Sequence, residues 1–566
     1  MNPAQFLSRF DRINEASNAI PRLRRFIFDL AVRGKLVEQD PRDEPASELL
    51  KRIQGEKTRL VKEGKIKELK PLAITDIAKE IYKIPSSWKL VPLGETVNSH
   101  LGGGTPSKNN STYWDGEILW ASVKDVGKGK YIDETIDRIT EAGLADSSSN
   151  LIPPGSLIVV TRMGLGKVSI NRVPIAINQD LRALSLSSLV SIDYHYIFFK
   201  THGFEGTGLT VKGIKVEELL NITFPLPPLD EQHRIVAKVD ELMALCDRLE
   251  LAQAERESRL DRLAAASLQR LNQPAEAVSV FREHARFYFN CLPRLTTRQD
   301  HIQQLRQTIL NLAVRGQLVP QDPNDEPASE LLIRIQEEKA RLLKEGMIGP
   351  EKPPIPARAD ELAFELKPGW QAARISQILV ELQTGPFGSS LHQSDYEKGG
   401  IPVINPASIK SERLVPVESM AVGPKTLKRL STFKLHAGDI VMARRGEMGR
   451  CAVVTKQENG WLCGTGSLIL RFPEFVFPHF FVTLIGSPFV REYLGSSAVG
   501  ATMQNLNQSI LLNLVIALPP LAEQHRIVAK VEELMALCDR LEVQLTTTQT
   551  ESRRLLEAVL HEALSA

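Results

Sequence analysis

Two glycine-containing turns carry clusters of cationic side chains directly after apolar runs. Arg162 and Lys167 belong to the run GSLIVVTRMGLGK, and Arg444, Arg445 and Arg450 belong to the run GDIVMARRGEMGR. An apolar run followed by glycine indicates a strand that ends in a tight turn. Arginine and lysine bind phosphate oxygens, and arginine also pairs with the edge of guanine. We therefore interpret both turns as candidate DNA contacts, with a solvated basic turn as the alternative.

Three other loops could serve the same chemistry. Lys108 ends the loop GGGTPSK, and Lys124 and Lys128 lie in KDVGKGK. The segment GTGLTVKGI, which contains Lys212, aligns with GATMQNLN, which contains Gln504. Glycine lets a backbone approach DNA closely, and glutamine can pair with adenine through two hydrogen bonds. Ordinary turns and helix caps are the alternative for each loop. GGGTPSK also lacks the spacing of a phosphate-binding GxxxxGK[ST] loop.

Residues suited to catalysis or metal binding form no convincing group. The string INPAS lacks the second proline and the aromatic residue of adenine methyltransferases, which grip a flipped base. We find no PD-(D/E)xK nuclease pattern, and the five cysteines include no CxxC pair. His233 and His525 follow Glu-Gln at a helix start, where capping or an interface contact is expected. The sequence thus predicts no catalytic residue and no metal site.

Near-identical segments occur twice and frame these loops. Residues 30–66 match residues 312–348, and residues 225–250 match residues 517–542. Two matching halves indicate a pseudo-dimer within one polypeptide. We expect the shared segments to perform one common role and the segments between them to perform two parallel, different roles.

The divergent segments contain short Val, Ile and Leu runs broken by Gly and Pro, which predicts mixed α/β domains. Their alignment pairs Trp88 with Trp370 and Gly102 with Gly385. The expected domains are a helical region at 1–84, a mixed domain at 85–224, a long helix at 225–282, a second helical region at 283–365, a second mixed domain at 366–516 and a long helix at 517–566.

Both long helices are predicted from a heptad seam, in which apolar residues lie alternately four and three positions apart. The seam residues are Ile235, Val239, Leu242, Cys246 and Leu249, repeated as Ile527, Val531, Leu534, Cys538 and Leu541. A long helix with one apolar seam needs a partner. We therefore expect the two helices to form an antiparallel coiled coil with pseudo-two-fold symmetry.

Length and composition restrict the function classes. A chain of 566 residues is too long for one domain, and no apolar run is long enough for a membrane span. We expect a cytoplasmic protein. The net charge of only +2 means that any DNA binding must depend on local basic patches or on basic partners.

Taken together, the block PPLDEQHRIVAKVDELMALCD with its copy, and the block GKLVEQDPRDEPASELLKRI with its copy, resemble the specificity subunit of type I restriction–modification enzymes. The resemblance covers essentially the whole chain. It implies an α+β fold with two target-recognition domains between long conserved helices.

The same resemblance implies a non-catalytic subunit in which each variable domain reads one half of a split site in double-stranded DNA. Its implied partners are two DNA adenine methyltransferase subunits and motor–nuclease subunits. S-adenosylmethionine, ATP and magnesium would belong to those partners, with no cofactor on this chain. A coiled-coil adaptor that binds proteins only is the alternative.

Overall fold

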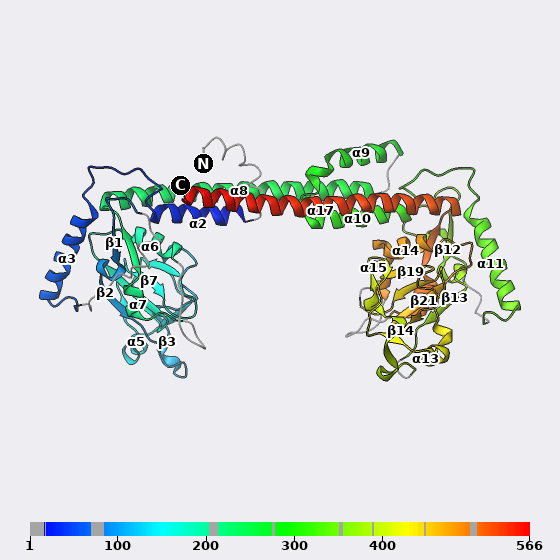
Figure 1. Cartoon of the computed structure of the whole chain (residues 1–566), viewed down its shortest axis with the longest axis horizontal. Helices are drawn as coiled ribbons and strands as arrows, with labels where there is room; N and C mark the ends of the chain where they lie inside the picture. Colours follow the sequence, from blue (N-terminus) through cyan, green and yellow to red (C-terminus); the bar gives the residue numbers. More distant parts are fainter. Residues whose placement is uncertain are drawn as a thin grey trace. The chain divides into compact units, whose positions relative to one another are not determined.

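The computed structural model describes residues 16, 18–68, 84–202, 213–273, 278–349, 355–387, 390–446, 449–497 and 506–565 (Figure 1). The chain divides into two compact units, residues 1–255 with 548–566 and residues 256–547. No helix within the described ranges combines the length and the apolar character that a membrane span requires.

The first unit is built around two sheets. Their orders are β2-β10-β7-β8-β4 and β5-β3-β9-β6, and β1 pairs separately with β11. The strands are β1 (Lys89–Pro92), β2 (Val97–Gly102), β3 (Trp114–Ala121), β4 (Tyr131–Ile132), β5 (Asp137–Ile139), β6 (Leu151–Ile152), β7 (Leu157–Val160), β8 (Val168–Asn171), β9 (Ile175–Ile177), β10 (Leu181–Leu186) and β11 (Thr223–Leu226).

Helices cover the face of the five-stranded sheet that is turned away from the smaller sheet. The helices of this unit are α2 (Ala19–Val32), α3 (Ala46–Lys62), α5 (Glu141–Asp146), α6 (Ile192–Thr201), α7 (Val216–Leu220) and the first part of α8 (Leu229–Asn272). The hydroxyl of Ser191 accepts a hydrogen bond from the Tyr194 amide and so caps α6. Gly34 and Gly64, at φ +67° and +68°, follow α2 and α3 in the left-handed conformation that glycine adopts readily at helix ends.

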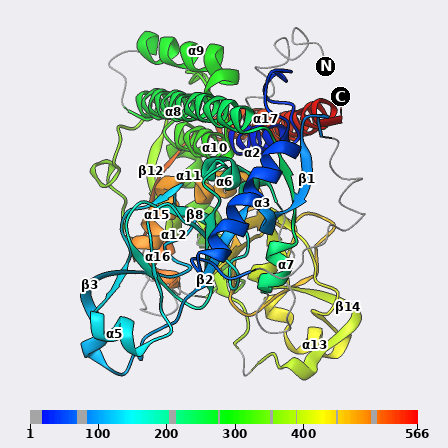
Figure 2. The same ribbon diagram turned by 90° about the vertical axis from the view of Figure 1, so that its left-hand side faces the viewer.

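Strand β7 lies between two apolar cores, one on each face of the five-stranded sheet. Its residues Leu157 and Val159 join the core beneath the helices, whereas Ile158 and Val160 join the core shared with the smaller sheet. A strand buried on both faces is apolar throughout rather than alternating, and this is why the sequence there is an unbroken LIVV. The smaller sheet and α5 lie at the end of the domain away from α8 (Figures 1 and 2).

The second unit repeats this plan. Its sheets have the orders β13-β21-β18-β19, β17-β14-β20 and β15-β16, and β12 pairs with β22. Its strands are β12 (Gln371–Arg374), β13 (Glu381–Thr384), β14 (Tyr396–Ile404), β15 (Ile409–Lys410), β16 (Arg413–Leu414), β17 (Ala421–Val422), β18 (Ile440–Ala443), β19 (Cys451–Val453), β20 (Leu462–Cys463), β21 (Ser467–Arg471) and β22 (Val515–Leu518). The expected pair of mixed α/β domains is confirmed.

The helices of the second unit follow the same order, with three additions among the described residues, α9, α12 and α15, and with only the first part of α17 in this unit. They are α9 (Val278–Leu295), α10 (Gln299–Val314), α11 (Ala328–Lys344), α12 (Ile375–Ile378), α13 (Pro424–Arg429), α14 (Pro478–Gly486), α15 (Pro488–Ser497), α16 (Gln508–Asn513) and α17 (Leu521–Ser565). Helix α10 corresponds to α2, α11 to α3, α14 to α6 and α17 to α8. Helix α9 spans the expected domain boundary between residues 282 and 283.

The heptad seams of α8 and α17 are buried within their own repeats. Ile235, Val239 and Cys246 join a core that includes α2 and α3, with Leu242 and Leu249 partly buried against it. Ile527, Val531, Leu534 and Cys538 join a core that includes α10, with Leu541 partly buried. That second core also contains Ala264, Leu268 and Leu271 of α8, so part of α8 and part of α17 share one apolar cluster.

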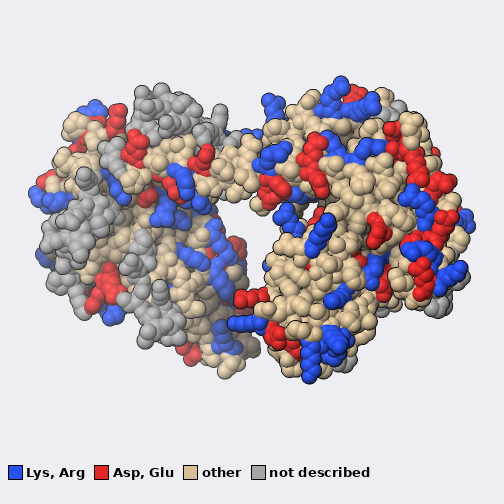
Figure 3. Space-filling model, turned by 45° about the vertical axis from the view of Figure 1, so that its right-hand side comes forward, with Lys and Arg blue, Asp and Glu red and all other residues tan. Residues whose placement is uncertain are grey.

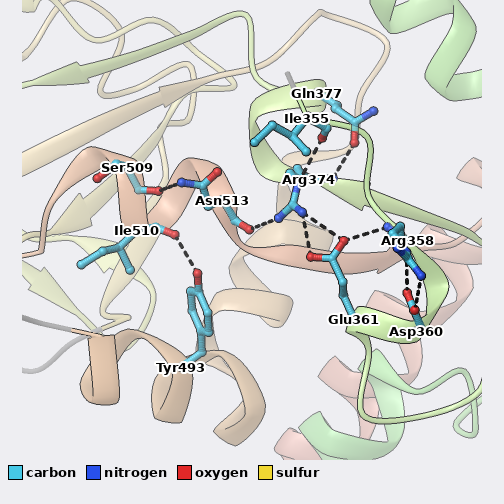
Figure 4. A network of polar contacts seen from close by, with 10 residues as sticks. All are labelled: Ile355, Arg358, Asp360, Glu361, Arg374, Gln377, Tyr493, Ser509, Ile510 and Asn513. Atoms are coloured by element: carbon cyan, nitrogen blue, oxygen red, sulfur yellow. Dashed lines mark hydrogen bonds and ion pairs between the residues drawn. The ribbon is translucent and has the colours of Figure 1, made fainter. Parts of the chain in front are cut away.

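An arginine cluster fixes the chain that enters the second domain. The Arg374 guanidinium donates to the carbonyl oxygens of Ile355, at 3.1 Å, and Asn513, at 2.8 Å, and pairs with the Glu361 carboxylate at 2.7 Å (Figure 4). Arg374 therefore ties residues 355–361 to the end of α16. The matching position of the first domain is Pro92, which cannot form such a cluster.

Candidate nucleic-acid interface

In the first domain, the loops that follow β2, β3, β7 and β9 meet at one edge, together with residues 213–214 ahead of α7. We call residues 102–108, 122–130, 161–167, 178–180 and 213–214 the first loop corner. The Gly104 amide donates to the Ile177 carbonyl at 3.0 Å, and the Thr161 amide donates to the Asp180 carbonyl at 2.8 Å. The Ile214 amide donates to the Thr161 carbonyl at 3.0 Å. Backbone hydrogen bonds thus hold separate loops together.

The second domain builds an equivalent edge. We call residues 385–387, 405–408, 444–450, 464–466 and 506–508 the second loop corner, of which 447 and 448 lie outside the described residues. The Arg444 amide donates to the Gly466 carbonyl at 2.8 Å, and the Leu506 amide donates to the Arg444 carbonyl at 3.1 Å. Arg444 therefore occupies the place of Thr161, and Gly466 occupies the place of Asp180.

Close backbone approach explains one glycine in each corner. A Cβ on Gly103 would lie 1.7 Å from the Ile177 carbonyl oxygen, and a Cβ on Gly385 would lie 2.2 Å from the Gly464 carbonyl oxygen. The strand registers also pair Gly385 with Gly103. The expected pairing with Gly102 is therefore wrong by one residue, because three adjacent glycines hide a one-residue shift from a sequence alignment.

The first corner brings most of its predicted cations together. Arg162, Lys167, Lys124 and Lys128 are all exposed. The loop that carries Lys124 and Lys128 touches the turn that carries Lys167, since a Cβ on Gly127 would lie 3.2 Å from Lys167 Cβ. Lys108 is exposed in a neighbouring turn, whereas Lys212 lies outside the described residues.

The three predicted arginines of the second corner differ in burial and in their contacts. Arg444 is half-buried, and its Nε donates to the Leu506 carbonyl at 2.9 Å, so this guanidinium holds the corner closed. Arg445 is exposed beside the 464–466 turn, with its Cδ 3.8 Å from a Cβ placed on Gly466. Arg450 is half-buried, and its Nε has no hydrogen-bond partner among the described residues. Gln504 lies outside those residues.

Charges of both signs are mixed on one face of the molecule and inside one of the corner loops. On the face drawn in Figure 3, Lys and Arg side chains are interspersed with Asp and Glu side chains. Even within the KDVGKGK loop, Lys130 is committed to ion pairs with Asp193 at 3.0 Å and Asp240 at 3.8 Å. On this face, positive charge therefore occurs as local groups rather than as one continuous basic area.

The sequence analysis missed three polar residues of the first corner. Thr105 Oγ1 donates to Gln179 Oε1 at 2.6 Å, and Asp180 lies 3.8 Å from the Arg162 guanidinium. A signal existed for Gln179 and Asp180, because the polar string Asn-Gln-Asp separates two buried strands and aligns with Gly-Thr-Gly at 464–466.

Each domain is attached to its long helix by the same buried clamp. Trp88 Nε1 and Gln39 Nε2 donate to the two oxygens of Glu231, at 2.9 and 2.6 Å. Trp370 Nε1 and Gln321 Nε2 make the same bonds to Glu523, both at 2.9 Å. Burial raises the pKa of both carboxyl groups.

His233 and His525 lie at the starts of α8 and α17, and other residues of these helix starts form ion pairs within the chain. Arg234 pairs with Asp43 at 2.6 Å, and Arg526 pairs with Asp325 at 2.6 Å. His233 and His525 are exposed, and the His525 ring stacks on a phenylalanine ring at 3.9 Å. Glutamate and arginine of each turn thus make intramolecular contacts, and the exposed His525 ring makes one as well.

Comparison with known proteins gives the family. The model of the type I restriction modification DNA specificity domain matches residues 85–256 and 368–548. The EcoEI specificity subunit of Escherichia coli is 31% identical over 96% of this chain and 94% of its own length. The EcoAI specificity subunit of Escherichia coli is 30% identical over the same shares. The solved HsdS subunit from Thermoanaerobacter tengcongensis aligns with 85% of this chain and 98% of its own, at 19% identity and a TM-score of 0.42. The chain therefore belongs to the family of type I restriction–modification specificity subunits.

Proposed function

We propose that the chain is the DNA-recognition subunit of a type I restriction–modification complex and that each loop corner reads one half of a split target in double-stranded DNA. One observation carries this proposal. The two corners are held by equivalent backbone hydrogen bonds but carry different side chains. Equal backbones would present the loops to DNA in the same way, and different side chains would select different bases.

The repeated clamps support a scaffolding role for the long helices. Each domain is held to its helix by the same Trp, Gln and Glu contacts. Two equal attachments favour two equal partners, which we propose are DNA adenine methyltransferase subunits, with motor–nuclease subunits joining them. In this proposal the partners bind S-adenosylmethionine, ATP and magnesium, the chain itself is not catalytic, and the complex acts in the cytoplasm.

A DNA-binding titration of the full-length chain, with and without methyltransferase subunits, tests the proposal. We expect the chain to select duplexes that share one sequence pattern from a random library. Its affinity for DNA should fall as the salt concentration rises, since cationic contacts with phosphates release counterions. A protein-interaction adaptor would associate with the methyltransferase subunits, but adding it would neither raise their affinity for DNA nor make them prefer one sequence. That outcome would contradict the proposal.

A further inference from the structure

The turn between β9 and β10 holds one exposed amide on a rigid base. Asn178 and Asp180 are buried, and they bond to each other: Asn178 Nδ2 donates to Asp180 Oδ2 at 3.2 Å, and the Asp180 amide donates to Asn178 Oδ1 at 3.1 Å. Gln179 lies between them and is exposed. Its neighbours therefore fix the backbone from which the Gln179 side chain projects.

A second loop fixes the end of that side chain. Thr105 Oγ1 donates to Gln179 Oε1 at 2.6 Å, which ties the amide to the 102–108 loop of the same corner. The amide oxygen has two lone pairs and the amide nitrogen carries two protons. One lone pair is used by Thr105, so the exposed end still offers one acceptor and a donor beside it.

The groups around Gln179 suit a negatively charged duplex. Arg162 is exposed and lies 3.8 Å from Asp180, the next residue along the chain. Lys167 extends from the same β7–β8 turn as Arg162 and is exposed as well. Cations that bind phosphates position a protein on DNA, and a fixed polar side chain between them can reach base edges.

We propose that Gln179 is a base-reading residue of the first domain and that it selects adenine in the major groove, with Thr105 as its positioning residue. Adenine presents an N7 acceptor and an N6 donor there, which matches the donor and acceptor left on the Gln179 amide. The assignment rests on the proposed function, because it names a specificity residue within the same loop corner.

The second domain differs at this position. Thr465 takes the place of Gln179, between Gly464 and Gly466. A threonine hydroxyl cannot supply the paired donor and acceptor of an amide, although its methyl group can contact thymine. The two half-sites should therefore differ in the base that this turn contacts.

The test uses the full-length chain with its methyltransferase subunits and selection from randomised DNA duplexes. Gln179→Leu should reduce the preference for adenine at one position of one half-site by about 5- to 150-fold, the range of one two-bond base contact. Thr105→Val should reduce the same preference less, since it frees the amide without removing it. Gln457→Leu, at an exposed glutamine in a turn of the second domain, should change neither half-site.

A fourth variant guards against a simple loss of folding. Gln179→Glu should move the preferred base at that position from adenine to cytosine, since a carboxylate accepts from the cytosine amino group. Unchanged preferences in Gln179→Leu, or a loss spread evenly over all positions, would overturn the assignment while leaving a DNA-binding subunit in place. If the unaltered chain selects no sequence, the proposed function itself fails.

Discussion

The clamp between the first domain and its long helix is open to a conservative test. The substitution is Glu231→Gln, which keeps the shape of the side chain but replaces one carboxylate oxygen with an NH2 group. Glu231 is 1% exposed and accepts from Trp88 at 2.9 Å and from Gln39 at 2.6 Å. After the change, Trp88 and Gln39 can both stay bonded only if the Gln39 amide turns over, which reverses its bond with the Ser87 hydroxyl at 2.8 Å, and both bonds then join neutral groups.

The magnitude follows from burial. A hydrogen bond to a charged group contributes about 1.5–3 kcal/mol and one to a neutral group about 0.5–1.5 kcal/mol, so weakening the two bonds costs about 1 kcal/mol each. Burial raises the pKa of Glu231, which means that the charged carboxylate is disfavoured there, so loss of the charge offsets part of this cost. We expect a net loss of about 1–2 kcal/mol, which is about a 5- to 30-fold increase in local opening.

Hydrogen exchange of the full-length protein measures this opening locally. Exchange should accelerate in β1 and β11, which pair from Lys89↔Leu226 to Pro92↔Thr223. The equivalent clamp at Glu523 is an internal control, and β12 and β22 should keep their exchange rates. Unchanged exchange in β1 and β11, or equal acceleration in both domains, would refute the reasoning.

Further predictions concern pH, DNA contact and spacing. Burial lowers the pKa of Lys57 to about 8 from 10.5, so the unfolded state binds more protons between these values and stability should rise with pH across them. Lys57→Met should abolish that rise in thermal unfolding at pH 8 and 10, whereas Lys339→Met, at the matching position, should not. If Arg445 contacts a phosphate, Arg445→Ala should reduce the slope of log affinity against log salt concentration by about one. If Arg445 contacts guanine, the same change should reduce discrimination at one base by ~1–3 kcal/mol. No change in either quantity would reject both roles. Four residues inserted near Ala264 add about 6 Å of helix, nearly two base pairs at about 3.4 Å each, so methylome sequencing should find the same half-sites with a longer gap.

The repeated elements could be predicted because their signals are local. The heptad spacing from Ile235 and from Ile527 predicted both long helices, which begin at Leu229 and Leu521. The apolar run GSLIVV predicted a strand that ends in a turn, and β7 ends at Val160, directly before the turn that carries Arg162. Periodicity and glycine placement depend on residues that are close in sequence, so they can be recognised before the fold is known.

The chemistry of the loop corners could not be predicted in the same way. Arg444 and Arg445 are adjacent and identical in type, yet Arg444 bonds to Leu506, 62 residues away, and Arg445 is exposed. Gln179 became a candidate only because Thr105, 74 residues earlier, holds its amide. Contacts between residues this far apart in sequence are set by the fold of the whole domain.

The most direct measurement of the central claim is methylome sequencing of DNA modified by the full-length chain with its methyltransferase subunits, compared with a variant in which residues 85–224 come from another family member. We expect two short specified half-sites separated by unspecified bases, and we expect the exchange to alter one half-site while the other half-site and the gap stay the same. A single continuous motif, or an exchange that alters both half-sites or only the gap, would contradict the division into two readers on a shared helical frame.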